Sequence, residues 1–458
     1  MTTPVVPATA PVAPAPAALV LELPRPRRGR PPLRDEILRG DRLAGLDPAD
    51  LAERFGTPCY VYDFDLVERR VAGLRAALPP VVDLAYAVKS NPALALVAHV
   101  GALGMGADVA SGGELATVLR AGIDPSRVVM TGPGKREVEL AAAVEAGIRA
   151  ITVESPGELA RLEAIAAATG RRVPVMLRAA VGEATALERV RLVGDDGAGK
   201  FGMSLADLRL AARRAARSPH LEFLGLHRFG ASNVLDASGL AAHAAQTVEL
   251  AREIAAAAGA PLRLVDAGGG LGIPYELHDE PLDIAWFGRR LASLAERWEA
   301  AADTRGMRLL LEPGRYIAGP AGAYLSRVVD RKRVGDREVA ILDGGVHHVL
   351  RPALVGQEHR VRVLGSRARA ARTGCVTIAG PLCSGLDIFA ANAALAAPEP
   401  GDLVAVLDTG AYGFTESMPF FLSHPIPAEV AVRGGRAVVI RPRQEPSEWL
   451  ERQVVPSW

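Results

Sequence analysis

The chain has 458 residues, of which 49% are hydrophobic and 23% are charged, a composition typical of a globular protein with enough core for two or three domains. Its 53 Lys and Arg residues nearly balance 52 Asp and Glu, so the net charge gives no global reason to expect a nucleic acid or membrane partner. Three cysteines (Cys59, Cys375 and Cys383) are too few for a disulfide framework or a zinc cluster, which predicts no metal site and a cytoplasmic location.

Residues 1–35 are rich in Pro and Ala and then in Arg, which predicts a disordered tail. Within it, 27–31 (Arg-Arg-Gly-Arg-Pro) resembles an AT-hook, a minor-groove DNA-binding element, but five residues are a weak match. A solvated basic linker is the preferred interpretation, and a nucleic acid partner is not expected.

From residue 80 onward, short apolar runs alternate with stretches of helical spacing. Eight such runs predict an α/β fold, a (β/α)8 TIM barrel over 36–320 including an N-terminal lead-in, with an open doubly wound sheet as the rival. The predicted strands are 82–88, 106–110, 127–131, 149–153, 173–180, 221–227, 262–266 and 308–312. The predicted helices are 92–103, 112–121, 135–147, 155–168, 204–216, 237–258 and 283–305.

The pattern changes after residue 320, where apolar runs are separated by Gly, Pro and Asp. This spacing is typical of antiparallel strands and predicts a second, mainly β domain over 321–458. Its predicted strands are 338–342, 360–364, 374–379, 403–408 and 428–440.

One polar residue at the end of the first barrel strand stands out, because only four of the 53 basic residues are lysine. Lys89 directly follows an apolar strand, at the end of a barrel where active sites lie. A snorkelling surface lysine is the competing interpretation. A desolvated amine, with a lowered pKa and able to attack an aldehyde, is preferred.

Glycines 268–270 follow the seventh strand. The dinucleotide pattern GxGxxG fails, because residue 273 is not glycine, whereas glycine amides at this place in a barrel suit a phosphate. After the eighth strand, Arg315 can bind the phosphate and Glu312 can hold a pyridinium nitrogen. An amine, a phosphate cradle and a carboxylate together indicate pyridoxal phosphate.

These residues also resemble a known family, the fold type III pyridoxal-phosphate decarboxylases, which include diaminopimelate, ornithine and arginine decarboxylases and share their barrel with alanine racemase. The resemblance covers roughly residues 40–440. Its motifs are YAVKSNP at 86–92, DVASGGEL at 108–115, GGGLGIPY at 268–275, EPGR at 312–315, GPLC at 380–383 and GAYG at 410–413.

The resemblance implies that Lys89 links covalently to the cofactor and that Glu312 pairs with its pyridine nitrogen. It also implies that Cys383 donates a proton after loss of carbon dioxide, from the partner subunit of a homodimer with shared sites. Phosphate would be held by Ser232, Gly269, Gly270, Arg315 and Tyr412, next to Gly314, while Asp108 and Glu114 would support the lysine and the cofactor.

Two positions depart from the family pattern. Phe229 stands where the family usually stacks a histidine on the cofactor ring, so His227 is a candidate for part of that role. Ser384 replaces an acidic residue that binds the distal amine of the substrate, and Asp387 is the candidate to compensate.

The side chains that meet the substrate are less well defined. Arg351 matches a family substrate-binding position, and Arg178 and Arg228 are further candidates for substrate carboxylates. His347 and His348 lie nearby, and if they stand on a strand at most one can face the site.

Three segments, ASNVLD at 231–236, ESPGELARL at 154–162 and FFLSHPIPAEV at 420–430, look more like a branch that decarboxylates modified amino acids. This branch includes a siderophore citryl-diamino acid decarboxylase and a carrier-protein-linked glutamate decarboxylase. The leading hypothesis is therefore an α-decarboxylase of an amino acid with an extended or acylated side chain. A diaminopimelate decarboxylase of lysine biosynthesis, a racemase of the same fold and a catalytically silent homologue remain as alternatives.

Overall fold

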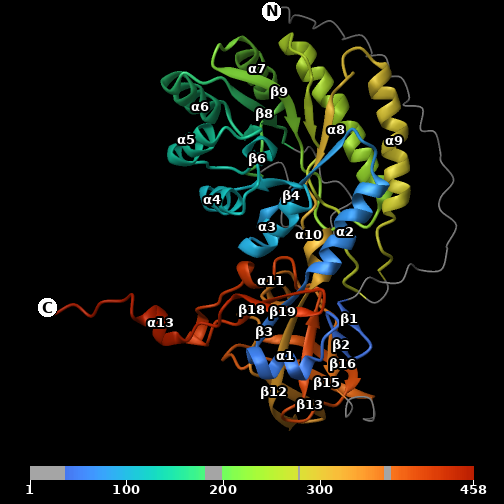
Figure 1. The fold of residues 1–458 in the computed structure, drawn as a ribbon, viewed down its shortest axis with the longest axis vertical. Helices are drawn as coiled ribbons and strands as arrows, with labels where there is room; N and C mark the ends of the chain where they lie inside the picture. Colours follow the sequence, from blue (N-terminus) through green and yellow to red (C-terminus); the bar gives the residue numbers. More distant parts are fainter. Residues whose placement is uncertain (1–36, 181–198, 277–278, 366–372) are drawn as a thin grey trace, which may run out of the picture.

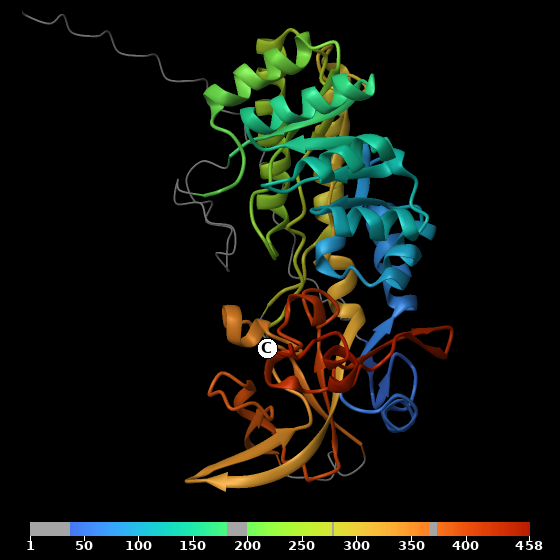
Figure 2. The same cartoon turned by 90° about the vertical axis from the view of Figure 1, so that its left-hand side faces the viewer.

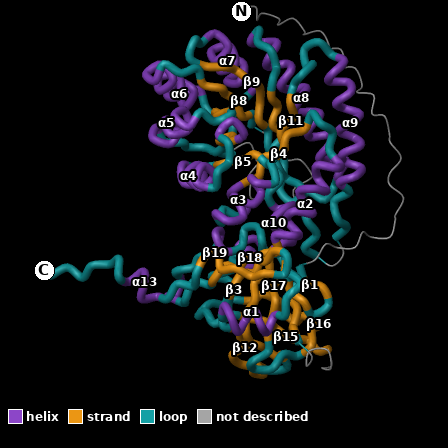
Figure 3. Tube along the Cα trace, in the orientation of Figure 1, coloured by secondary structure: helices purple, strands orange, loops and turns teal. Residues whose placement is uncertain are grey.

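A computed structural model describes residues 37–180, 199–276, 279–365 and 373–458. The predicted tail at 1–35 lies outside the described residues. Figure 1 shows two parts arranged along the long axis of the molecule, a barrel ringed by helices and a second part rich in strands. The coloured trace in Figure 3 shows the same division.

The first part is a closed barrel of eight parallel strands in sequence order, which confirms the predicted (β/α)8 fold. Its strands are β4 (Val82–Ala87), β5 (Gly106–Val109), β6 (Val128–Met130), β7 (Ala150–Val153), β8 (Val173–Arg178), β9 (Leu221–His227), β10 (Leu264–Asp266) and β11 (Arg308–Leu311). Inside the barrel, buried apolar side chains from six of the eight strands form its core: Ala85, Val129, Ala150, Met176, Leu264 and Leu310.

The helices around the barrel are α2 (Phe64–Ala77), α3 (Leu94–Ala102), α4 (Gly112–Arg120), α5 (Glu137–Ala146), α6 (Pro156–Thr169), α7 (Leu205–Arg217), α8 (Ala237–Ala258) and α9 (Ile284–Ala300), followed by the short α10 (Arg315–Ala318). Those from α3 to α9 lie where the apolar periodicity predicted helices, whereas α2 and α10 lie outside the predicted ranges. Side-chain caps mark several starts, such as Ser155 before α6 and Asp236 before α8. None of the helices in the described ranges combines the length and apolar character needed to cross a bilayer.

The second part is a nine-stranded sheet with the order β16-β15-β13-β12-β3-β18-β19, in which β17 also pairs with β12 and β14. Its strands are β3 (Cys59–Asp63), β12 (Gly322–Val334), β13 (Arg337–Leu342), β14 (Val361–Leu364), β15 (Thr373–Ala379), β16 (Ile388–Ala396), β17 (Leu403–Leu407), β18 (Ala428–Arg433) and β19 (Arg436–Arg441). The remaining elements are β1 (Leu38–Arg39), β2 (Arg42–Leu43), α1 (Pro48–Phe55), α11 (Arg351–Val355) and α13 (Pro446–Leu450). Figure 2 shows β12 and β13 extending away from the barrel.

Three features of this sheet differ from the sequence prediction. β3, from the predicted lead-in to the barrel, pairs instead with β12 and β18 in the sheet. The predicted run 428–440 is a hairpin, because Gly434 and Gly435 adopt the positive φ of a tight turn. Two strand pairs, β13 with β15 and β3 with β18, are parallel.

Candidate active site

Lys89 follows β4 and faces the end of the neighbouring strand β5. Its Nζ lies 2.5 Å from Oδ2 of Asp108, and the other carboxylate oxygen of Asp108 accepts a hydrogen bond of 2.5 Å from Oγ1 of Thr131. Asp108 is buried, whereas 40% of the Lys89 side chain is accessible. The amine is therefore held in place by a buried carboxylate and can still be reached by a ligand.

The ionisation of Lys89 differs from the sequence prediction. Burial lowers the pKa of the amine, but the negative charges of Asp108 and Glu312 raise it further, so the pKa lies above its usual value. The predicted lowered pKa is wrong for this state, because an opposite charge at hydrogen-bond distance outweighs desolvation. Asp108 therefore holds the amine of Lys89 and favours its charged form.

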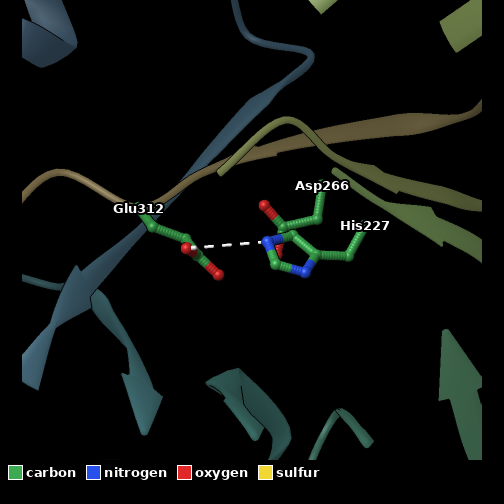
Figure 4. Close-up of side chains that lie close together, drawn as sticks. All are labelled: His227, Asp266 and Glu312. Atoms are coloured by element: carbon green, nitrogen blue, oxygen red, sulfur yellow. Dashed lines mark ion pairs between the residues drawn. The ribbon is translucent and has the colours of Figure 1, made fainter. Parts of the chain in front are cut away.

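His227, Asp266 and Glu312 converge at the ends of β9, β10 and β11 (Figure 4). All three are buried, and Nε2 of His227 lies 4.0 Å from Oε2 of Glu312. Burial lowers the pKa of His227 well below its usual value and raises the pKa of Asp266 to about 7. Burial and the neighbouring Asp108 and Asp266 carboxyls also raise the pKa of Glu312 well above its usual range.

Both ring nitrogens of His227 are buried without a hydrogen-bond partner among the described residues, whereas the carboxyls of Asp266 and Glu312 interact with each other. Buried polar atoms nearly always have a partner, so this cluster fits a ligand that brings its own polar atom, as a pyridine nitrogen does. One side-chain nitrogen or oxygen from each of His227, Asp266 and Glu312 lies within 4.8 Å of the other two, a spacing that would also suit a metal ion.

The glycines after β10 allow two backbone segments to approach closely. A Cβ atom on Gly269 would lie 2.6 Å from the Glu312 carbonyl oxygen, and one on Gly270, where φ is +90°, would lie 2.5 Å from the carbonyl oxygen of Ala231. Gly314 is similarly restricted, by Ser90 at 2.8 Å. Only glycine fits at these positions, which keeps the turn tight.

Arg315 lies beside this turn, among the residues predicted to hold phosphate. Its Nη1 donates to the Tyr275 hydroxyl at 2.8 Å, its Nη2 donates to Oγ of Ser232 at 3.5 Å, and its guanidinium lies 4.5 Å from the centre of the Tyr412 ring. Tyr412 comes from the loop after β17, where its amide donates to the Ser90 carbonyl at 2.7 Å. The structure thus gathers Ser232, Arg315 and Tyr412 from both parts of the chain.

Two further residues of the predicted cofactor site lie at the same strand ends. A Cβ on Gly268 would lie 2.9 Å from Cδ2 of Phe229, so this ring covers the glycine turn. Glu114 accepts a hydrogen bond of 2.7 Å from the Ala110 amide, next to the Asp108 strand, and burial raises its pKa.

Arg351, the predicted substrate residue, begins α11 and is buried. Its Nη1 donates to Oε2 of Glu416 at 2.7 Å, and its Nε donates to Oε1 of Gln357 at 3.1 Å. Its guanidinium lies 5.1 Å from the centre of the Tyr412 ring, so Tyr412 contacts both Arg315 and Arg351. Arg351 therefore lies beside the predicted cofactor residue Tyr412, and its charge is paired with the carboxylate of Glu416 from the same chain.

Arg178, at the end of β8, is also paired within the chain. Its Nη1 lies 2.6 Å from Oε1 of Glu154, its guanidinium covers the Phe201 ring at 4.4 Å, and both charged side chains are buried. A second buried ion pair, Lys135 with Glu158 at 2.7 Å, lies among the elements that follow β6 and β7. These pairs extend the charged rim of the barrel beyond the predicted site residues.

The loop that carries Cys383 is held by Asp387, the residue predicted to compensate for Ser384. Asp387 is buried, and its two carboxylate oxygens accept hydrogen bonds from the amides of Val346 and Leu382, at 2.7 and 2.8 Å. Ser384 Oγ accepts from the Leu386 amide, while Cys383 is exposed. Asp387 thus holds this loop against Val346. Each of its two carboxylate oxygens accepts a hydrogen bond from a backbone amide.

His347 and His348 also differ from the prediction that their side chains face opposite ways. They stand in a turn rather than on a strand, both are buried, and their ring centres lie 3.7 Å apart. Sequence reasoning missed Tyr275, Gln357, His359 and Glu416. Tyr275 lies inside the GGGLGIPY motif and could have been found there, but the other three have no motif and are assembled only by the fold.

Comparison with known proteins identifies the family. The pyridoxal-binding domain of the pyridoxal-dependent decarboxylases matches residues 64–319, more than half of the chain. The chain belongs to this family. Its barrel is a pyridoxal-binding domain, and the cofactor of the family is pyridoxal phosphate.

Relatives and solved structures extend the match to both parts of the chain. Diaminopimelate decarboxylase of Zymomonas mobilis is 31% identical over 89% of this chain and 95% of its own length. The L-glutamyl-[BtrI acyl-carrier protein] decarboxylase of Niallia circulans is 32% identical over 86% of this chain and 94% of its own length. The crystal structure of Helicobacter pylori diaminopimelate decarboxylase with L-lysine has a TM-score of 0.80 at 28% identity, covering 88% of this chain and 99% of that one.

Proposed function

We propose that this decarboxylase removes the α-carboxyl group of an amino acid whose distal end carries no free charge, such as an amide or a thioester. One observation carries the proposal. The guanidinium of Arg351, which would otherwise bind a distal carboxylate, is paired with Glu416 at 2.7 Å. The substrate end of the site therefore offers no uncompensated cation from Arg351.

The loop of Cys383 supports the same conclusion for a distal ammonium. Ser384 stands at the position after the cysteine where an acidic residue would bind an amine. The nearby Asp387 is buried and each of its oxygens already accepts a backbone hydrogen bond, so this carboxylate is occupied in holding its own loop. The relative named as an acyl-carrier-protein decarboxylase is consistent with an acylated distal end.

The residues at the strand ends fit the cofactor, and each would bind a different part of it. Arg315, Ser232 and the glycine turn would hold the phosphate, and Glu312 would hold the pyridine nitrogen, with Phe229 and His227 beside the ring. Bound pyridoxal phosphate supplies an aldehyde for an amine and a ring that accepts an electron pair. Asp108 would hold the Lys89 amine beside the aldehyde.

Reprotonation of the product is assigned to Cys383. Its thiol is exposed in this chain, and the hydrogen bonds of its loop run to the Val346 amide and within the loop itself. We therefore propose a homodimer in which Cys383 of one subunit completes the site of the other.

A second candidate is meso-diaminopimelate, which would make the product L-lysine. It is favoured by the relatives, since proteins named diaminopimelate decarboxylase match 88–91% of the chain at 31–34% identity. Against it stand Ser384 and the internal pairing of Arg351.

Release of carbon dioxide from the cofactor-loaded enzyme discriminates the two. The substrate panel contains meso-diaminopimelate, lysine, ornithine, arginine, carrier-protein-bound glutamate and a citryl-diamino acid, whose citryl group keeps free carboxylates. Turnover of carrier-protein-bound glutamate, at a specificity constant well above those of diaminopimelate and the citryl-diamino acid, is the expected result. Turnover of diaminopimelate alone would contradict the proposal, and absence of cofactor absorbance would contradict the assignment of the site.

A further inference from the structure

Arg351 is held as firmly as a core residue. Only 2% of its side chain is exposed, and two of its nitrogens donate to Glu416 and Gln357. The centre of the guanidinium lies over the Tyr412 ring, 5.1 Å from the ring centre. A buried arginine is stable only when its charge is compensated, and Glu416 is the carboxylate that compensates it.

Gln357 is itself oriented by a neutral histidine. Nδ1 of His359 lies 2.9 Å from the Leu407 carbonyl oxygen, which can only accept, so Nδ1 carries the proton. Nε2 of His359 then accepts from the amide nitrogen of Gln357 at 3.2 Å, which turns Oε1 of Gln357 toward Arg351. Burial lowers the pKa of His359 to about 4, which keeps this arrangement at neutral pH.

Glu416 lies on the outer side of Arg351, and 28% of its side chain is exposed. The loop that carries it is tied down by its neighbour Ser417. Oγ of Ser417 donates to the Gly413 carbonyl at 2.6 Å and accepts from the amide of Leu350 at 3.0 Å. Because Leu350 directly precedes Arg351, the loop and the arginine are fixed to each other.

We propose that Glu416 is a specificity-determining residue, an internal carboxylate that occupies Arg351 and so excludes substrates with a free distal carboxylate. This inference rests on the proposed function, whose substrate has an uncharged distal end. It also assigns a role to a residue that neither motif nor spacing indicated. The pair is oriented from both sides, by Gln357 and by the loop of Ser417, as a specificity device requires.

Removal of Glu416 leads to a gain of binding, which a merely damaged protein would not show. Without this carboxylate the buried Arg351 loses its counter-charge. A ligand carboxylate that reaches the same place restores the charge balance and the hydrogen bond. The corresponding ω-amide restores only a neutral hydrogen bond, so the ratio of acid to amide affinity reports the change.

The experiment uses the full-length, cofactor-loaded protein and three pairs of probes. These are L-glutamate, L-2-aminoadipate and L-2-aminopimelate, each beside its ω-amide, so that the series covers several distances from Lys89. Dissociation constants are measured from the cofactor absorbance, or by calorimetry where absorbance does not respond. The variants are Glu416→Ala and Glu416→Gln, the double variant Arg351→Met with Glu416→Ala, and Glu253→Gln as a control at an exposed ion pair.

The wild type and Glu253→Gln are expected to bind no acid more tightly than its amide. In Glu416→Ala the acid-to-amide preference of at least one pair should rise 10-fold or more, by the equivalent of about one charge-assisted hydrogen bond. Glu416→Gln should show a smaller rise, and the double variant none. A wild type that already prefers the acids, or an unchanged ratio for every pair in Glu416→Ala, overturns the inference. Neither result changes the carbon dioxide measurement that tests the proposed function. The Glu416 inference and the proposed function can therefore fail separately.

Discussion

Lys89 and Asp108 come from neighbouring strands, and their charged atoms lie 2.5 Å apart. The carboxylate is in turn held by Thr131, so three successive strand ends form one hydrogen-bonded chain. A lysine in this setting is both positioned and charged, and its reaction with an aldehyde requires that the proton first leave. The pairing therefore controls the pH range in which the cofactor can attach.

The first prediction concerns this pH range. Asp108 raises the pKa of Lys89, so Asp108→Asn should move the pH midpoint of the cofactor attachment rate down by about 1–3 units. Stopped-flow absorbance across pH 7–12 compares the wild type with the variant, whose attachment rate should be higher at every pH below the wild-type midpoint, and Lys89→Ala, which cannot form the covalent link, is the control. An unchanged midpoint would show that Asp108 does not control the amine.

The second prediction separates phosphate binding from ring binding. Arg315→Met should weaken the affinity for pyridoxal phosphate about 10- to 100-fold, because a charge-assisted hydrogen bond to an anion is lost. The affinity for pyridoxal, which has no phosphate, should change little. Equilibrium titration of both compounds measures the difference, and equal losses for the two would argue against a phosphate site at Arg315.

The third prediction tests Asp387 as a loop-holding residue rather than a substrate ligand. In Asp387→Asn one backbone amide would face an amide NH2 group, which should lower the free energy of unfolding by about 1–3 kcal/mol. Denaturant unfolding measures this loss, and the exposed Cys383 should react faster with a thiol reagent. A large rise in the Michaelis constant at unchanged stability would instead place Asp387 against the substrate.

The fourth prediction follows from the proposed shared sites. Lys89→Ala and Cys383→Ala should each lose clean amine formation, whereas a refolded mixture of the two should recover up to about a quarter of the wild-type activity, because mixed dimers contain one intact site. Activity against mixing ratio is the measurement. No recovery, with dimer exchange verified by mass spectrometry, would indicate that both residues act within one subunit.

The fifth prediction concerns stability at the opposite end of the barrel. Asp83 lies 2.5 Å from both Arg149 and Arg308. Burial raises the pKa of Asp83, but the hydrogen bonds from these arginines lower it further, below its usual value. A carboxylate with a lowered pKa stabilises the fold above its unfolded pKa, and this contribution is lost as the pH falls through the folded pKa.

Asp83→Asn should therefore cost about 2 kcal/mol at pH 7, and the difference from the wild type should shrink below about pH 4. Urea unfolding at a series of pH values gives both numbers. The exposed pair Arg209 with Glu253 provides the control, since Glu253→Gln should change the stability by less than about 1 kcal/mol. A loss that stays constant down to pH 2 would contradict the assignment.

Local sequence was enough to predict the barrel and the position of most site residues. Apolar runs and helical periodicity are set by burial within a few residues, and the end of each strand then lies at one rim. Lys89, Glu312 and Arg315 could be placed there without any knowledge of contacts. The glycines at 268–270 could also be interpreted locally, because a close backbone approach leaves no room for a Cβ atom.

The tertiary structure alone decided how these groups are charged and paired. Asp108 turns the expected lowering of the Lys89 pKa into a rise. The strand β3 joins a sheet whose other strands lie more than 250 residues away in the sequence. Glu416 forms an ion pair with Arg351, which lies 65 residues earlier in the sequence. Such pairings depend on distances that only the folded chain sets, and ionisation depends on those distances. The sequence by itself determined which chemistry this protein carries, and the fold determined which of its charges are left for a substrate.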